Sequence, residues 1–152
     1  MKLKDDVREL YQQTILDHNK NPQNFRKLEV FNRYSEGYNP FCGDHFHVYM
    51  MINDDTIKDI TFQGAGCAIS KASASLMSLI LKNKRIIEVE EIFNMFHNMI
   101  TIDDIENNIE KLGKLIVFNG IHEYPSRVKC AILIWHTMNN ALKNENKFTL
   151  IE

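Results

Sequence analysis

The alternation of apolar and other residues predicts a β-hairpin in the first half of the chain. Every second residue of one run is apolar, namely Phe46, Val48, Met50 and Ile52. The polar turn at residues 53–55 separates this run from a second β-prone segment, residues 56–63. Period-two alternation on both sides of turn residues is typical of antiparallel strands. We also expect a short strand over residues 30–35, and helices must cover one face of the hairpin.

Apolar residues at helical spacing predict helices before and after this hairpin. They span residues 3–18, 68–84, 88–100 and 105–112. A loop with Gly120 and Pro125 is then expected to lead to a long final helix that starts at Arg127. The polar residues from about Lys143 onward predict a frayed tail.

Composition and charge limit the classes of function. The 152 residues, 44% of them apolar, predict one domain over residues 1–152. The 18 basic and 20 acidic residues give a net charge of −2, so we expect no nucleic-acid or membrane partner. The N-terminal residues lack a signal-peptide pattern, and no run approaches the roughly 18 apolar residues of a membrane span, which predicts a cytoplasmic protein. Three cysteines in a reducing compartment favour metal binding or thiol chemistry over disulfides.

The sequence around Cys67 is typical of a reactive or metal-binding thiol. Gly64 and Gly66 allow a tight turn before it, and the helix that follows is rich in alanine and serine. A thiol at a helix start lies in the field of unpaired N–H groups and ionises more easily. The alternative is a small buried hydrophobic residue.

Two more cysteines are predicted to join Cys67. Cys42 and Asp44 flank a glycine just before the first hairpin strand, and antiparallel pairing returns the end of the second strand to this point. Cys130 is expected in the first turn of the final helix, where Arg127, on the same face, would favour its thiolate. Three thiolates and a carboxylate suit tetrahedral zinc, and iron in a sulfide cluster accepts the same ligands. Three unrelated buried thiols are the alternative.

Three separated sequence blocks each carry one of these cysteines. They read Asn-Pro-Phe-Cys-Gly-Asp at 39–44, Phe-Gln-Gly-Ala-Gly-Cys-Ala-Ile-Ser-Lys-Ala-Ser-Ala-Ser at 62–75, and Arg-Val-Lys-Cys-Ala at 127–131. In this order they resemble the SufU branch of the NifU/IscU family of iron-sulfur assembly proteins, and the likeness covers nearly the whole chain. The long segment before Arg127 favours the SufU branch, as does Lys129, which stands where the IscU branch has a histidine.

The resemblance implies an α+β fold, a three-stranded antiparallel sheet with helices packed on one face. It also implies a Zn²⁺ ion held by Cys42, Asp44, Cys67 and Cys130. The implied partner is a PLP-dependent, SufS-like cysteine desulfurase, one of whose histidines replaces Cys42 on the zinc, so that Cys42 accepts the persulfide sulfur. Arg127 would steady the released thiolate or persulfide, and a downstream cluster scaffold or apo-proteins would receive the sulfur.

Two other functions fit the same residues. The first is a scaffold that assembles a labile [2Fe-2S] cluster on the four ligands and transfers it to apo-proteins. The second is a structural zinc domain that only docks a partner. The chain departs from the family pattern at Ala68, Lys71 and the pair His45 and His47. These two histidines lie near Cys42 and offer substitute ligands, but the alternation of the strand predicts that they face solvent.

Overall fold

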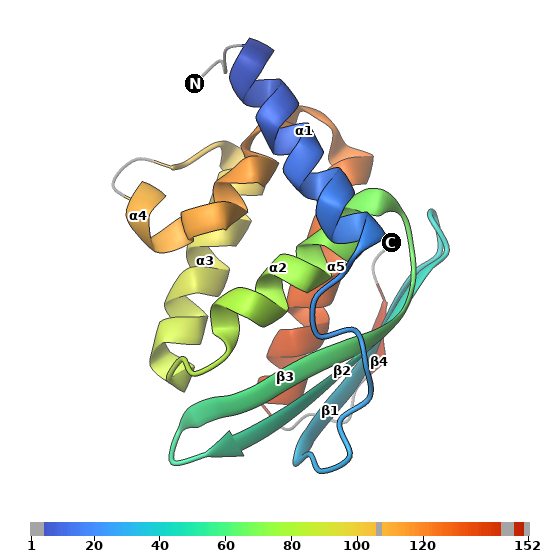
Figure 1. Cartoon of the computed structure of the whole chain (residues 1–152), viewed down its shortest axis with the longest axis vertical. Coiled ribbons are helices and arrows are strands. Elements are labelled where there is room, and N and C mark those ends of the chain that lie inside the picture. Colours follow the sequence, from blue (N-terminus) through green and yellow to red (C-terminus); the bar gives the residue numbers. More distant parts are fainter. Residues whose placement is uncertain (1–4, 106–107, 144–147, 151–152) are drawn as a thin grey trace.

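The body of the protein is a β-sheet with helices packed on one of its faces (Figure 1). The computed structural model describes residues 5–105, 108–143 and 148–150. Strands β1 (Arg33–Asn39), β2 (Asp44–Asn53) and β3 (Thr56–Ala65) are antiparallel neighbours, which confirms the predicted α+β fold. Short strand β4 (Phe148–Leu150) pairs in parallel with β1, so the order is β3-β2-β1-β4. The predicted frayed tail was therefore wrong for these three residues, and residues 144–147 and 151–152 of it lie outside the described residues.

The hairpin of β2 and β3 follows the apolar alternation. Phe46, Val48 and Met50 are completely buried against the helices. The turn places Asp54 and Asp55 at φ angles of 53° and 56°, the left-handed pair that two-residue hairpin turns require. The prediction of this hairpin is confirmed, and it aligns the start of β2 with the end of β3.

Strand β1 is longer and begins later than predicted. Its inward residues are small or polar, and Ser35 and Asn39 are buried. A Cβ at Gly37 would collide with Thr137 on the last helix, so the sheet and that helix approach closely here. Because this face carries no apolar alternation, the strand is defined by pairing with β2 and packing on the helix, which sequence periodicity does not report.

The α-helices match the predicted helices within a few residues. They are α1 (Asp5–Lys20), α2 (Ala68–Leu81), α3 (Ile86–Ile102), α4 (Ile109–Leu112) and α5 (Pro125–Leu142). The predicted loop before the last helix was wrong. It is a 3₁₀ helix, η1 (Gly113–Glu123), whose apolar side chains enter the core at Leu115, Phe118 and Ile121. Helix α5 starts at Pro125 rather than Arg127, because proline suits the first helical position.

Helices α2 and α5 cross in close contact through small residues. The Ser73 hydroxyl donates to the Ala131 carbonyl at 2.7 Å and accepts a hydrogen bond from the Trp135 indole at 3.1 Å. Trp135 is fully buried and stacks on Phe96 of α3, with ring centroids 4.7 Å apart. The small alanine and serine side chains of α2 therefore allow α2 and α5 to approach closely.

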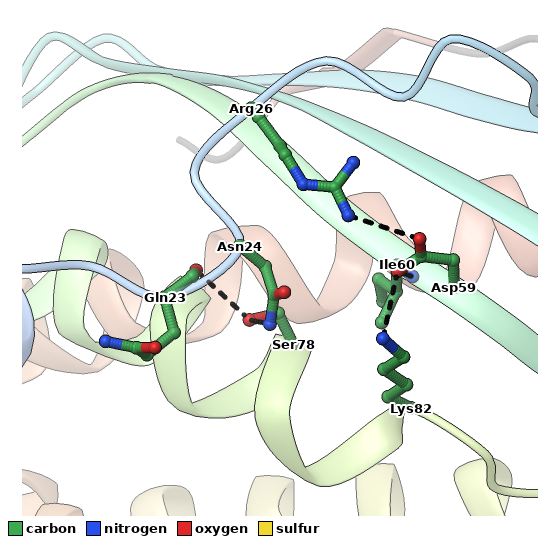
Figure 2. Close-up of polar contacts among 7 residues, drawn as sticks. All are labelled: Gln23, Asn24, Arg26, Asp59, Ile60, Ser78 and Lys82. Atoms are coloured by element: carbon green, nitrogen blue, oxygen red, sulfur yellow. Dashed lines mark hydrogen bonds and ion pairs between the residues drawn. The ribbon is translucent and has the colours of Figure 1, made fainter.

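The segment between α1 and β1 is tied to α2 and β3 by polar contacts (Figure 2). The Asn24 amide donates to the Ser78 hydroxyl at 3.0 Å. Arg26 and Lys82 both pair with Asp59 of β3, at 3.2 and 3.8 Å. These contacts hold the segment across the end of α2 and on β3.

Candidate metal centre

The four predicted ligands come from three parts of the chain that meet at one end of the sheet. Cys42 lies in the turn between β1 and β2, and Asp44 is the first residue of β2. Cys67 lies between β3 and α2, and the pairing of His45 with Ala65 brings this connection beside that turn. Figure 1 shows the two connections at the same end of the sheet. Cys130 lies in α5, in its second turn rather than in the first as predicted.

Three of the four donors form a compact group. The sulfur atoms of Cys42 and Cys130 are 3.1 Å apart, and the donor atoms of Cys42, Asp44 and Cys130 all lie within 4.8 Å of one another. Cys42 is exposed, whereas Cys130 is buried. Cys42 and Cys130, 88 positions apart in sequence, are in direct contact, and Cys67 hydrogen-bonds to Cys130, so the three thiols lie together.

Cys67 is adjacent to this group and caps helix α2. Its sulfur accepts a hydrogen bond from the Ser70 backbone N–H at 3.5 Å. Hydrogen bonding to Cys130 is the largest factor that lowers the pKa of Cys67, to about 6, and the Ser70 contacts act in the same direction. The prediction that its place at the start of a helix favours the thiolate agrees with this value.

Cys130, in contrast to Cys67, favours the protonated form of its thiol. Its hydrogen bond to Cys67, together with burial and a second contact to Cys42, raises its pKa far above that of an ordinary thiol. Without a metal ion, Cys130 therefore keeps its proton and hydrogen-bonds to the thiolate of Cys67. The group of thiols already carries one negative charge in this state. Such a site is prepared for a cation that binds thiolates.

Asp44 provides the test of whether a metal ion fits. The residue is completely buried, and one of its carboxylate oxygens, Oδ1, accepts the backbone N–H of Cys67 at 2.9 Å. The other, Oδ2, is buried with no hydrogen-bond partner among the described residues. Leaving a carboxylate oxygen buried and unpaired is costly, and a cation shared with the neighbouring thiols would satisfy it. The donor set thus fits Zn²⁺, which takes sulfur and carboxylate oxygen ligands.

Two glycines and one asparagine shape the backbone around these donors. Gly43 has a φ of 71°, which lets the chain turn between Cys42 and Asp44. A Cβ at Gly66 would lie 2.7 Å from Asp44 Oδ1 and would also collide with Ser70 Oγ. Asn39 is buried, and its side-chain oxygen accepts the Phe41 N–H at 3.1 Å. Sequence reasoning missed this role of Asn39, although an asparagine two residues before a turn position is a known turn signal.

The two basic residues near Cys130 stack on aromatic rings. The Arg127 guanidinium lies 4.6 Å from the centroid of the Tyr124 ring, and Arg127 is exposed. The Lys129 ammonium lies 4.6 Å from the centroid of Phe41, which precedes Cys42 and is 72% exposed. The predicted role of Arg127 toward a thiolate remains a prediction, and Lys129 with Phe41 forms a basic and aromatic rim beside Cys42.

Comparison with known proteins gives consistent results. The family model described as "NifU-like N terminal domain" matches residues 10–131. The chain is 41% identical to the iron-sulfur cluster assembly scaffold protein IscU of Thermotoga maritima, over 88% of this chain and 93% of that protein. It is 35% identical to the zinc-dependent sulfurtransferase SufU of Bacillus subtilis, over 90% and 91%.

A crystal structure gives the same result at the level of the fold. It is described as an iron-sulfur cluster assembly scaffold protein for the SUF system, from Fervidobacterium islandicum AW-1. It superposes with a TM-score of 0.81 at 35% identity and covers 88% of this chain and 97% of its own. Within the described residues, none of the helices has the length and apolar character needed to cross a membrane.

Proposed function

The chain belongs to the NifU-like N-terminal domain family, that of the iron-sulfur cluster assembly scaffolds IscU and SufU, and we propose that it is a zinc-dependent acceptor of persulfide sulfur. The proposed donor is a PLP-dependent cysteine desulfurase. The observation that carries the proposal is an exposed Cys42 thiol 3.1 Å from buried Cys130, beside a buried Asp44 oxygen that lacks a donor among the described residues. The name of the Bacillus subtilis relative supports the same activity.

Cys42, Asp44, Cys67 and Cys130 would hold the Zn²⁺ ion. When bound, Zn²⁺ keeps its cysteine ligands deprotonated at neutral pH and protects them from oxidation. The protein supplies the shape of the site: Asp44 is fixed by the Cys67 N–H, and Cys130 is buried on α5. Cys42 is the ligand that lies on an exposed turn, so it is the one that a partner protein reaches.

The transfer step uses Cys42 as the nucleophile. Its thiolate attacks the outer sulfur of the desulfurase persulfide, and a new S–S bond forms between Cys42 and that sulfur. The bond between this sulfur and the desulfurase cysteine breaks, and the desulfurase cysteine leaves as a thiolate. Electrons balance without an external oxidant or reductant. We propose that Arg127, at the first turn of α5, offsets the negative charge on the acceptor sulfur.

A second function, a scaffold for a [2Fe-2S] cluster, is favoured by the names of the Thermotoga and Fervidobacterium relatives. The same thiolates suit iron, and the cluster would then be cargo that is passed on. Protein purified without added metal separates the two functions. One zinc per chain and no sulfide-dependent visible absorption support the acceptor, whereas a cluster spectrum after reconstitution with iron and sulfide supports the scaffold.

The acceptor role is tested by the variant Cys42→Ala with a desulfurase and cysteine as substrate. We expect loss of desulfurase stimulation and no added sulfur mass on the chain after one turnover. Asn53→Ala, at the exposed last residue of β2 and far from the site, is the matched control and should retain both. Circular dichroism checks that both variants are folded. Unchanged stimulation and an unchanged sulfur adduct in Cys42→Ala would remove Cys42 from the mechanism.

A further inference from the structure

The solvent face of the sheet carries a second group of metal-binding side chains. Glu36 on β1 is the direct cross-strand partner of His47 on β2, and His45 lies two residues before His47 on the same face. The donor atoms of these three residues all lie within 4.8 Å of one another. The prediction that the histidines face solvent is confirmed, but the register of β1 also places a carboxylate between them.

The distances are close to those of a shared metal ion. One oxygen of Glu36, Oε2, is 2.5 Å from His45 Nε2 and 3.8 Å from His47 Nε2. Ligands at about 2.0–2.2 Å from one zinc ion lie about 3–3.5 Å from each other, so shifts of about 1 Å in exposed side chains suffice. The three side chains retain 32%, 46% and 31% exposure in the order Glu36, His45 and His47, so an ion and water ligands can reach them.

The surroundings of His47 orient its ring for ligation. The Tyr34 hydroxyl lies 2.6 Å from His47 Nδ1, and its ring stacks on the imidazole. A metal-binding histidine usually hydrogen-bonds through its second nitrogen, which fixes the tautomer and directs the other nitrogen to the ion. In the tautomer whose Nδ1–H donates to the Tyr34 oxygen, Nε2 carries the lone pair, and this nitrogen lies 3.8 Å from Glu36 Oε2. The Tyr38 ring packs edge-on against His45 at 5.8 Å.

The local charge also favours a cation. Within the described part of the chain, the ion pairs of Glu36 are those with the two histidines, and no lysine or arginine pairs with it. Two imidazole nitrogens and one carboxylate form a set of nitrogen and oxygen donors that leaves coordination positions open for water, a set that suits divalent zinc and its first-row neighbours.

We propose that Glu36, His45 and His47 form a second site, on the solvent face of the sheet, for a divalent transition-metal ion such as Zn²⁺. The site is independent of the cysteine centre because successive residues of a strand point to opposite faces. Asp44 enters the core side, and His45 points to the other side. The protein therefore binds one metal ion on each side of the first residues of β2.

The proposal is tested by titrating the zinc-loaded wild-type protein with further Zn²⁺, followed by calorimetry and by NMR of the histidine ring nitrogens. We expect a second equivalent to bind and to shift the Nε2 signals of His45 and His47. Glu36→Gln, His45→Gln and His47→Gln should each weaken this second equivalent at least about 10-fold and leave the cysteine-bound zinc in place. Tyr34→Phe keeps the ring stacking and should weaken it by about 10-fold or more.

His97→Gln and Glu90→Gln are the matched controls, because both residues lie on α3, away from the sheet face. They should leave the second equivalent unchanged. Circular dichroism and thermal melts show whether each variant is folded. The proposal is overturned if the second equivalent binds only at roughly millimolar free Zn²⁺, if the Nε2 signals do not move, or if the control variants weaken it as much as the site variants do.

Discussion

The two faces of β2 at its start carry different kinds of donor. On the core side, Asp44 is completely buried and its Oδ1 is fixed by the Cys67 N–H. On the solvent side, the side chain of His45 is 46% exposed and contacts Glu36 of the neighbouring strand β1. A buried set of donors is built by tertiary packing and tolerates few changes, whereas an exposed set needs only strand register. Substitutions on the core side should therefore have the larger effects.

The largest effect is expected on the pKa of the Cys67 thiol in metal-stripped protein when Cys130 is replaced. Its pKa of about 6 lies below the ordinary value of 9.0 chiefly because of the Cys130 hydrogen bond, a change of about 1000-fold in acidity. In Cys130→Ala we expect the pKa to return toward 9. The pH dependence of iodoacetamide labelling, read at each cysteine by mass spectrometry, measures it. A Cys67 midpoint that stays near 6 in Cys130→Ala would show that the hydrogen bond is not the cause.

The same pKa shift has a consequence for stability. The folded pKa of Cys67 is lower than the unfolded one, so the unfolded chain binds more protons between about pH 6 and pH 9. The contribution of Cys67 to the free energy of unfolding is therefore fully present above pH 9 and is lost as the pH falls through about 6. Urea denaturation of metal-stripped wild type and Cys67→Ser over this range should show a larger rise of stability with pH in the wild type. The difference between the two proteins reports Cys67, because the lowered pKa values of half-buried His18 and His136 act in both.

The next effect is expected from Asp44→Asn. The amide oxygen still accepts the Cys67 N–H, but the negative charge is lost, so we expect zinc affinity to fall by about 100-fold or more. Competition with a chelator of known affinity measures this change. Asp54→Asn, in the exposed turn at the other end of β2, is the control and should keep wild-type affinity. Equal affinities in the two variants would exclude Asp44 as a ligand.

A smaller effect is expected from Gly66→Ala. The new methyl group would lie 2.7 Å from Asp44 Oδ1 and collide with Ser70 Oγ, which should destabilise the fold by about 1–3 kcal/mol. Gly120→Ala is the control, because no atom lies within 4 Å of its ideal Cβ. Urea denaturation of both variants measures the difference. Equal midpoints would mean that the connection before α2 adjusts freely and that the core side is less tightly packed than it looks.

The smallest effect is expected at the rim of the site, from Lys129→Gln. The contact of the ammonium with the exposed Phe41 ring is worth about 0.5–1 kcal/mol at most. Zinc stoichiometry should be unchanged, because Lys129 is directed to this ring. Metal analysis together with urea denaturation tests both expectations. Loss of zinc in this variant would place Lys129 in the metal centre. Residues that zinc binding requires would then extend beyond the core side of β2.

Much of the fold was predictable because it depends on local patterns. The alternation in β2 and the turn at Asp54 and Asp55 predicted the hairpin, and helical spacing predicted the helices. The strand β1 and the 3₁₀ helix η1 were not predicted correctly. Strand β1 has small and polar inward residues that gain stability from α5 and β2, and η1 buries apolar residues without α-helical spacing. Both are defined by contacts distant in sequence.

The sequence by itself determined which residues are available for chemistry. The three cysteine-bearing blocks and Asp44 next to the hairpin were enough to predict that donors meet at one end of the sheet. Only the tertiary structure decided how they share protons, because the Cys67 and Cys130 contact joins the start of α2 to α5. It also decided the partner of His45 and His47, since Glu36 reaches them through the register of β1. Long-range packing sets such distances, and a linear pattern of residues does not contain them.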